Sequence, residues 1–403
     1  MSGSTTTAQP GIVNASCSHT NLLFTSGHGE LHGRGIAETI SLPARGGDRK
    51  SSPLQQEVLS VFAKARKAGI DNPVIMGAIP FDMNEPSCLY LPEHCEWQPQ
   101  SAVYPAQSAD PWLPQLLEQR SYPDEQGFQK VVEHAIVNFQ HSDIRKAVLS
   151  VMRELHFAAS VDVDTLLANL RAQNPDGYQF RIPMPGGAEL IGVSPELLIR
   201  KSEDRIWSNP LAGSAKRQKQ ADDDNLAAKQ LMTSSKDHYE HRLVIDDVRR
   251  ILAPLCRQLE IPAQPSLLAT PTLWHLSTLA KGVLLEPELN ALQLACYLHP
   301  TPAVCGYPTE RAHKLINLVE PFERGLFTGM VGWCDAQGNG EWVVTIRCGV
   351  VDRDVIRLFA GAGIVAASQP AAEWAETQAK LGTMLRACGL SCDTLASQPE
   401  VVV

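Results

Sequence analysis

The sequence predicts an α+β fold in which strands pair in antiparallel order and helices lie outside them. Residues 341–351 and 355–361 alternate apolar and polar side chains around a turn-like Asp-Arg-Asp step, which is typical of a β-hairpin. Residues 178–183, 189–193 and 197–208 are further strand-like runs that follow one another with no helix between them. Adjacent strands joined by short turns favour antiparallel pairing over a Rossmann arrangement.

Helical patterns flank these strands. Segments with helical periodicity comprise residues 54–68, 126–140, 234–255 and 371–388. Ser234, followed three residues later by Asp237, is typical of a helix N-terminus, and Ser368 with Pro370 suits the start of the last helix. Strands and helices therefore occur in blocks rather than in βαβ alternation, and this arrangement indicates the α+β class.

Composition narrows the class of protein. The chain has 403 residues, of which 44% are hydrophobic and 20% are charged, a globular composition that can bury a large core. Length alone predicts about two or three domains, or one unusually large fold. The formal net charge of -9 argues against nucleic-acid binding, which needs clustered Lys and Arg. Small anionic ligands respond to the local field instead, so net charge does not exclude them.

The sequence also predicts where the protein resides. No apolar run approaches the roughly 18 residues that span a bilayer, and the N-terminus lacks the apolar segment of a secretory signal. The cysteines are scattered without a CxxC pair, which favours reduced thiols over a zinc ribbon or a disulfide motif. We therefore expect a cytoplasmic protein with no membrane contact. Residues 1–20 are expected to be a flexible leader and residues 391–403 a flexible tail.

The last predicted helix carries Glu373, Glu376 and Lys380 on one face, because they are spaced three and four residues apart. Taken alone, this pattern indicates a solvated face with an ion pair. Directly upstream, the Ala-Gly-Ala-Gly run at 360–363 follows a strand, and glycine there lets backbone N–H groups approach a ligand closely. A strand, a glycine-rich turn and a helix with carboxylates and a lysine could together hold a metal ion and an anion.

Asp237 and Glu240 form a second acidic pair at the start of the helix that begins near residue 234. Acidic residues in a first helical turn are ordinarily explained by the helix dipole. If this helix end met Glu373 and Glu376, however, four carboxylates would converge and repel one another unless a divalent cation lay among them. Oxygen ligands alone suit Mg²⁺. The flanking histidines do not favour zinc, because no HExxH spacing exists.

Glu196 and Lys146 are candidates for acid–base chemistry. Glu196 stands between two apolar strand runs, where burial would raise its pKa toward the range of a general acid; the alternative is a turn residue that faces water. Lys146 lies inside the strand-like run 144–150. It either extends to solvent from a strand edge or points into a cleft with a depressed pKa, and the first arrangement is normally commoner.

These motifs occur together in one family. The chain resembles the chorismate-utilising enzymes, and most closely the isochorismate synthases of catecholate siderophore pathways, over about residues 50 to 390. The motifs that carry the resemblance are the runs 77–82, 89–93, 192–196, 210–214, 236–243, 270–276, 299–303, 332–334, 345–348, 360–364 and 373–380. The resemblance implies a single catalytic unit over residues 21–390, in which two antiparallel sheets pack together with helices outside.

The resemblance also implies roles for individual residues. Lys146 matches the general base that acts on the attacking water, and Glu196 matches the general acid that protonates the departing C4 hydroxyl of chorismate. Two residues match direct Mg²⁺ ligands, and two others match acidic positions that support the ion through waters: Glu240 and Glu376, then Asp237 and Glu373. The groups that match those holding or lining the substrate are Arg347, Lys380, the backbone of Gly361, Ala362 and Gly363, and also Gly213, Ser214, His275 and Ala303.

This assignment predicts an isomerase that adds water at C2 of chorismate and expels the C4 hydroxyl. Chorismate is a dianion, so Mg²⁺, Arg347 and Lys380 would offset its charge. Ala212 stands where the aminodeoxychorismate branch has a nucleophilic lysine, so covalent attack is not expected. Because Lys146 indicates water as the nucleophile, no glutamine amidotransferase partner is implied. Two alternatives stay open: a salicylate synthase, which would go on to eliminate pyruvate, and an inactive chorismate-binding protein.

Overall fold

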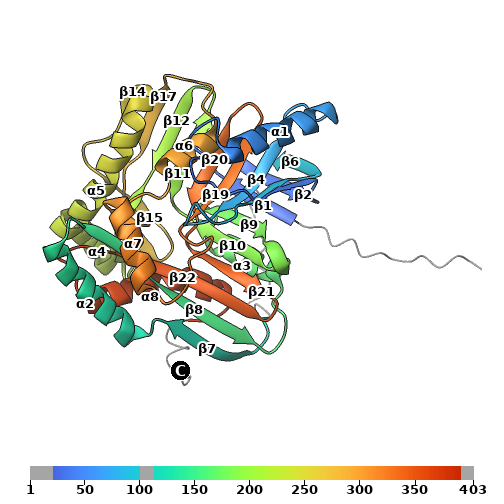
Figure 1. Cartoon of the computed structure of the whole chain (residues 1–403). Coiled ribbons are helices and arrows are strands. Elements are labelled where there is room, and N and C mark those ends of the chain that lie inside the picture. Colours follow the sequence, from blue (N-terminus) through green and yellow to red (C-terminus); the bar gives the residue numbers. More distant parts are fainter. Residues whose placement is uncertain (1–20, 100–112, 392–403) are drawn as a thin grey trace, which may run out of the picture.

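Two large antiparallel sheets form the centre of the fold (Figure 1). The computed structural model describes residues 21–99 and 113–391, so the predicted leader and tail lie outside the described residues, apart from residue 391. The ten-stranded sheet has the order β18-β8-β22-β21-β10-β9-β1-β2-β6, with β7 also paired to β8. Its strands are β1 (Asn21–Ser26), β2 (Gly29–Arg34), β6 (His94–Gln98), β7 (Leu116–Tyr122), β8 (Lys146–Phe157), β9 (Tyr178–Pro183), β10 (Glu189–Ser194), β18 (Gly306–Tyr307), β21 (Cys348–Asp352) and β22 (Val355–Ile364).

The second large sheet has nine strands in the order β14-β17-β12-β11-β20-β19-β4-β5-β3. These are β3 (Glu38–Ile40), β4 (Val74–Ile79), β5 (Cys88–Leu91), β11 (Leu197–Ser202), β12 (Arg205–Asn209), β14 (Cys256–Glu260), β17 (Ala280–Leu284), β19 (Met330–Asp335) and β20 (Gly340–Val344). The two packed antiparallel sheets are therefore confirmed. A third sheet, which the sequence did not predict, has the order β13-β16-β15 and comprises β13 (Leu211–Lys216), β16 (Leu273–Ser277) and β15 (Ser266–Ala269).

Helices cover the outer faces of the sheets (Figure 1). They are α1 (Pro53–Lys67), α2 (Glu125–His141), α3 (Val163–Gln173), α4 (Ala221–Thr233), α5 (Ser235–Leu252), α6 (Ala291–Leu298), α7 (Thr309–Val319) and α8 (Pro370–Ala387), with short 3₁₀ turns at Pro185–Gly187 and Ala253–Leu255. Four of them match the predicted segments closely. The Ser234 side chain accepts a hydrogen bond from the Asp237 N–H (3.2 Å), as its spacing predicted. None of the described helices is long and apolar enough to cross a membrane.

Apolar side chains fill three layers between these elements. One cluster packs α1, α5 and α6 against the nine-stranded sheet, and another packs α2, α3, α7 and α8 against the ten-stranded sheet. The third cluster lies between the sheets, where Phe24 and Phe180 of one sheet meet Val331 and Val343 of the other. The order is thus helices, sheet, sheet, helices, which buries one face of each helix and both faces of each sheet centre.

The single strand predicted over residues 341–351 is wrong, because this segment forms two strands in different sheets. Residues 341–351 were expected to form one continuous strand, but β20 ends at Val344 in one sheet and β21 begins at Cys348 in the other. Between them the chain crosses from sheet to sheet, and Arg347 takes a φ of 50°, which interrupts extended structure. The alternation of apolar residues persists through the crossing because both flanking strands are buried, so the pattern gives no sign of the break.

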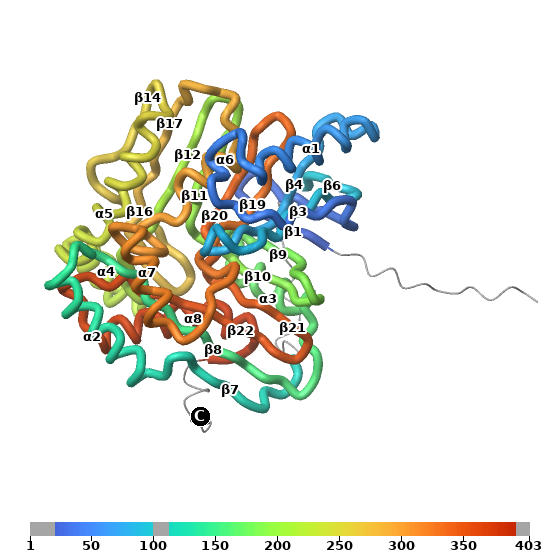
Figure 2. Tube along the Cα trace, in the orientation of Figure 1, coloured from blue at the N-terminus to red at the C-terminus, as the bar shows by residue number. Residues whose placement is uncertain are grey.

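A second crossing lies beside the first. The chain leaves β10 at Ser194 and enters β11 at Leu197, and the two crossings hydrogen-bond to each other through Val193 N–H to Arg347 C=O (3.0 Å) and Val344 N–H to Glu196 C=O (3.1 Å). Figure 2 follows these segments and shows β8 beside β22, although they are far apart in the sequence. Paired crossings between sheets therefore place Glu196 and Arg347 at the same point of the fold.

Candidate active site

One pocket lies where strands of the ten-stranded and three-stranded sheets meet α5, α8 and the two crossings between the large sheets. The predicted site residues that line it are Glu196, Gly213, Ser214, Glu240, His275, Ala303, Arg347, Gly361, Gly363, Glu376 and Lys380. A larger hollow of about 690 Å³ lies elsewhere, beside the edge strand β6 and near Trp97 and Trp333. Size alone therefore does not mark the functional site; we assign it to the smaller pocket, where acids, a lysine and an arginine meet.

Glu196 is buried at the crossing from β10 to β11. One of its carboxylate oxygens, Oε1, accepts a hydrogen bond from the Leu211 N–H (3.2 Å), which fixes the side chain at the pocket wall. Burial raises the pKa of Glu196 to about 7, although that N–H and the positive charges of Lys146 and Arg347 act in the opposite direction. The prediction of a buried, high-pKa carboxyl is thus supported, and the alternative of a water-facing turn residue is wrong.

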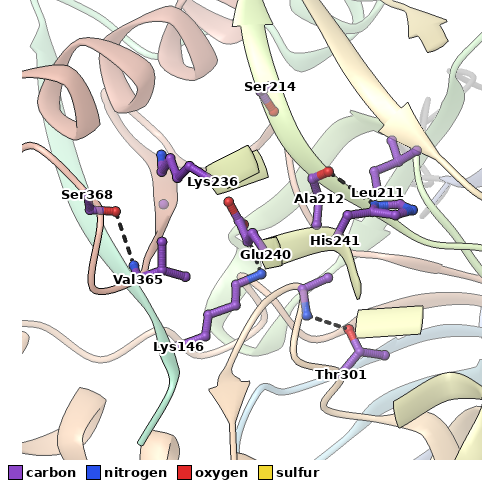
Figure 3. Close-up of polar contacts among 12 residues, drawn as sticks. Lys146, Leu211, Ala212, Ser214, Lys236, Glu240, His241, Thr301, Val365 and Ser368 are labelled. Carbon is purple, nitrogen blue, oxygen red and sulfur yellow. Dashed lines mark hydrogen bonds and ion pairs between the residues drawn. The ribbon is translucent and has the colours of Figure 1, made fainter. Parts of the chain in front are cut away.

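Lys146 is the first residue of β8, and its side chain is fully buried. Nζ lies 2.9 Å from Glu240 Oε1, close enough for an ion pair although not oriented for a hydrogen bond. Figure 3 shows Lys146 pointing toward Glu240, while Lys236 lies on the other side of the carboxylate in this view. Of the two arrangements that the sequence left open, the lysine takes the one aimed into the interior rather than the one that extends to solvent.

Glu240, Glu373 and Glu376 are each paired with a lysine. Besides the Lys146–Glu240 pair, Lys236 Nζ lies 2.6 Å from Glu373 Oε1, and Lys380 Nζ lies 2.7 Å from Glu376 Oε1. Glu373 is only 1% exposed. The face of α8 that carries these carboxylates is therefore not the solvated face that its spacing alone indicated, but an internal wall.

The carboxylates fit a divalent cation in donor chemistry. Asp237 and Glu240 of α5 and Glu373 and Glu376 of α8 offer oxygens alone, and the buried Oε2 of Glu373 has no hydrogen-bond partner. Within residues 21–99 and 113–391, no three His, Cys, Asp or Glu side chains come close enough to form a complete metal site. The three glutamates are each paired with a lysine, so a cation here would displace ammonium groups from them.

The pKa values of the two α8 carboxyls move in opposite directions. Burial and the neighbouring charge of Glu376 raise the pKa of Glu373 to about 7. Burial acts to raise the pKa of Glu376 as well, but the ammonium groups of Lys380 and Lys236 outweigh it and lower that pKa. The two carboxyls thus differ in how readily they ionise, because two negative charges in one buried site repel each other. A bound cation would reduce this repulsion.

Arg347 and His275 form a polar wall of the pocket. Arg347 Nη2 lies 3.3 Å from His275 Nε2, and Ser214 Oγ lies 2.8 Å from His275 Nδ1. A guanidinium can only donate, so Nε2 is the acceptor and Nδ1 carries the proton that is donated to Ser214. Burial, with Arg347 and Lys380 nearby, holds the pKa of His275 well below its usual range. The imidazole is therefore neutral, and it leaves Arg347 free to bind an anion.

Strand β22 supplies the floor of the pocket. The Gly361 carbonyl accepts a hydrogen bond from Lys380 Nζ (2.6 Å), which holds that ammonium at the pocket. The side chain of Ala362 points the other way, into the apolar cluster beneath the helices, so this predicted residue does not line the pocket by its side chain. Asp237 lies directly behind Gly213. The φ of Gly213 is 81°, which favours glycine, and a Cβ at this position would lie too close to the Asp237 side chain.

Gly363 leaves the space in which Lys146 and Glu240 meet. A Cβ at this position would lie 2.1 Å from Glu240 Oε1 and 2.9 Å from Lys146 Cε. We therefore expect Gly363→Ala to lower kcat by about 10- to 100-fold, because misplacement by a fraction of an ångström is enough to impair catalysis. Gly382→Ala on α8 is the control, since the nearest atom there is 3.9 Å away. Equal activity of the two variants would contradict the expectation.

Sequence reasoning missed the apolar half of the pocket. Its lining also includes Phe327, Ile346 and Phe359, together with Val148, Val304 and Thr328. Apolar residues give the same pattern whether they face a core or a ligand, so periodicity carried no signal for them. Lys236 was missed as well, although it lies inside a motif that carried the family resemblance.

The comparisons with known proteins agree with this geometry. Residues 93–389 match the family described as "Chorismate binding enzyme". The isochorismate synthase EntC of Escherichia coli K12 is 46% identical over 352 residues, which is 86% of this chain and 89% of that protein. The isochorismate synthase DhbC of Bacillus subtilis is 39% identical over 91% of this chain and 93% of its own length.

Solved structures give the same result. A crystal structure described as a putative 2,3-dihydroxybenzoate-specific isochorismate synthase, DhbC, of Bacillus anthracis has a TM-score of 0.85 and 38% identity. It covers 92% of this chain and 96% of that one. The menaquinone-specific isochorismate synthase MenF of E. coli has a TM-score of 0.75 at 23% identity, which shows a shared fold. From the matched family and these relatives, this chain belongs to the chorismate-binding enzymes.

Proposed function

We propose that this protein is an isochorismate synthase that converts chorismate to isochorismate and so supports the synthesis of 2,3-dihydroxybenzoate and catecholate siderophores. The observation that carries the proposal is a buried lysine, Lys146, in contact with the pocket-lining Glu240, beside a buried, high-pKa glutamate. The same pocket is lined by an arginine and a second lysine. The identities of 46% to EntC and 39% to DhbC, over most of each chain, support the same reaction.

Lys146 and Glu196 divide the proton transfers of the reaction between them. Lys146 takes a proton from the water that attacks C2, and Glu196 gives its proton to the hydroxyl that leaves C4. The two transfers balance, because one proton is gained by the lysine and one is lost by the glutamate. A binding protein would need neither group, so their presence together favours an enzyme over an inactive chorismate-binding protein.

Charge is matched to a dianionic substrate. Arg347 and Lys380 face the pocket and would hold the substrate carboxylates, with the arginine fork suited to a bidentate contact. Glu240 and Glu376 would bind Mg²⁺ directly, and Asp237 and Glu373 would support it through waters. When bound, Mg²⁺ would neutralise carboxylate charge at the substrate and among these side chains. The predicted cytoplasmic location, the single domain over residues 21–390 and the absence of an amidotransferase partner stay predictions.

Product analysis tests the proposal directly. The protein is incubated with chorismate and Mg²⁺, and isochorismate, salicylate and anthranilate are separated by chromatography. We expect isochorismate to accumulate without stoichiometric pyruvate, because the relatives named above are isochorismate synthases. Salicylate and pyruvate in equal amounts would instead identify a salicylate synthase, and unchanged chorismate would refute catalysis.

The pH dependence of turnover reports on Glu196. The carboxyl must be protonated to donate, and its pKa is raised to about 7, so the part of the pH profile that Glu196 sets is expected to fall as the pH rises through that value. The measurement is kcat from about pH 6 to about pH 9 with saturating chorismate and Mg²⁺. Glu196→Gln is the control, because its residual activity lacks this decline. A wild-type rate that stayed constant over that interval would count against Glu196 as the acid.

A further inference from the structure

Arg324 and Glu320 form a buried ion pair next to the pocket without lining it. Arg324 Nε donates to Glu320 Oε2 at 2.8 Å, and both side chains are at most 4% exposed. Glu320 Oε1 also accepts from the Ser150 N–H of β8 at 2.8 Å. A buried pair of this kind is costly to desolvate, so the remaining N–H groups of the guanidinium need partners of their own.

Those partners belong to three separate segments of the chain. Nη1 donates to the Val304 carbonyl (2.9 Å) and to Thr328 Oγ1 (3.2 Å). Nη2 donates to the Val148 carbonyl (2.7 Å) and to Ser150 Oγ (2.9 Å). With Nε on Glu320, every nitrogen of the guanidinium is bound, and the planar fork fixes the segments relative to one another.

Each of the three segments forms part of the pocket wall. Val148, Val304 and Thr328 all line it, although Arg324 does not. On β8, Val148 lies two residues after Lys146, and Thr328 is a β-branched residue with a φ of 58°. A β-branched side chain disfavours that backbone conformation, so the turn needs an anchor such as the Arg324–Thr328 hydrogen bond.

We propose that Arg324, held by Glu320, is a positioning residue that aligns β8, the segment at Val304 and the turn at Thr328 around the reacting substrate. The proposal rests on the proposed function. Arg324 acts on catalysis through these segments, since it touches none of the reacting groups. Arg347 and Lys380, which would hold the substrate carboxylates, are not among its partners, so the proposal predicts an effect on the rate of reaction rather than on substrate affinity.

The test compares Arg324→Lys with Arg181→Lys. Lysine keeps the charge but has one nitrogen, so it cannot join three segments. Arg181 is the control, because its side chain is largely buried and also contacts two groups, Glu189 and the exposed Asp164, away from the pocket. We expect R324K to lower kcat by about 10- to 100-fold with KM for chorismate within about threefold of the wild type. R181K should keep kcat even if its Tm falls as far.

A smaller change keeps the proposal testable if R324K does not fold. Ser150→Ala removes one acceptor from Arg324 and leaves its other contacts, and it should lower kcat severalfold with a smaller loss of Tm than R324K. Glu320→Gln combined with R324K should be no worse than R324K alone, because residues that act as one unit are not additive.

The outcomes are distinct. Wild-type kcat in the folded R324K variant, or in S150A where R324K does not fold, would overturn the proposal, and so would a rise in KM at unchanged kcat. A wild-type protein that formed no isochorismate would count against the proposed function instead.

Discussion

Lys146→Ala is expected to lower kcat for isochorismate formation by about 10²- to 10⁴-fold, the range over which a positioned general base accelerates a reaction. Its side chain is fully buried, and Nζ lies 2.9 Å from Glu240 Oε1. An amine on the protein surface could therefore not take over its role in the variant. The measurement is kcat with saturating chorismate and Mg²⁺, with the product identified by chromatography. Turnover within about tenfold of the wild type would refute the assignment of Lys146 as the base.

A second buried lysine, Lys201, provides a control that distinguishes a loss of catalysis from a loss of stability. Lys201 of β11 is 3% exposed, and burial lowers its pKa, but it lies near Cys334 and Asp335 rather than at the pocket. Lys201→Ala removes the same atoms from a similarly buried strand position. We expect it to lower Tm while leaving kcat of the folded protein unchanged. Parallel losses of kcat in the two variants would indicate that general destabilisation, not loss of a base, explains the first result.

Much of the secondary structure follows from local patterns. The hairpin of β21 and β22 was predicted from alternation and a turn, and α5 was predicted from the Ser234 cap and its apolar stripe. Both signals act within a few residues. The crossing between β20 and β21 was not predictable in this way, because its backbone hydrogen bonds go to Val193 and Glu196, which are remote in the sequence.

The candidate site, like the fold, was predictable only where the signal lies within a few residues. The sequence marked Lys146 and Glu196 as candidates, but their burial was left open, since burial depends on which elements cover a strand end. The family resemblance, rather than spacing, supplied their roles. Lys236 is a residue whose role could not be predicted. Its ion pair with Glu373 joins α5 to α8, and no local sequence pattern indicates a contact between elements so far apart in the chain.

Removing a proposed metal ligand is expected to affect Mg²⁺ before it affects the fold. Glu240→Gln and Glu376→Gln each remove one carboxylate charge, and we expect the Mg²⁺ concentration for half-maximal activity to rise by about 10- to 100-fold or more. Direct titration of Mg²⁺ by calorimetry should show the same loss without substrate turnover. Dialysis against a chelator should abolish wild-type activity, and added Mg²⁺ should restore it.

The same helix offers a matched control for this experiment. Asp247 of α5 is a buried carboxylate paired with a cation, Arg250 (2.7 Å), but it lies outside the pocket. Asp247→Asn should leave Mg²⁺ affinity unchanged, whereas Glu373→Gln should weaken it by less than the direct ligands do, because Glu373 is proposed to act through water. Unchanged Mg²⁺ affinity in both Glu240→Gln and Glu376→Gln would place the ion elsewhere. In that case the three lysine–glutamate pairs would be permanent charge partners rather than pairs that open for a cation.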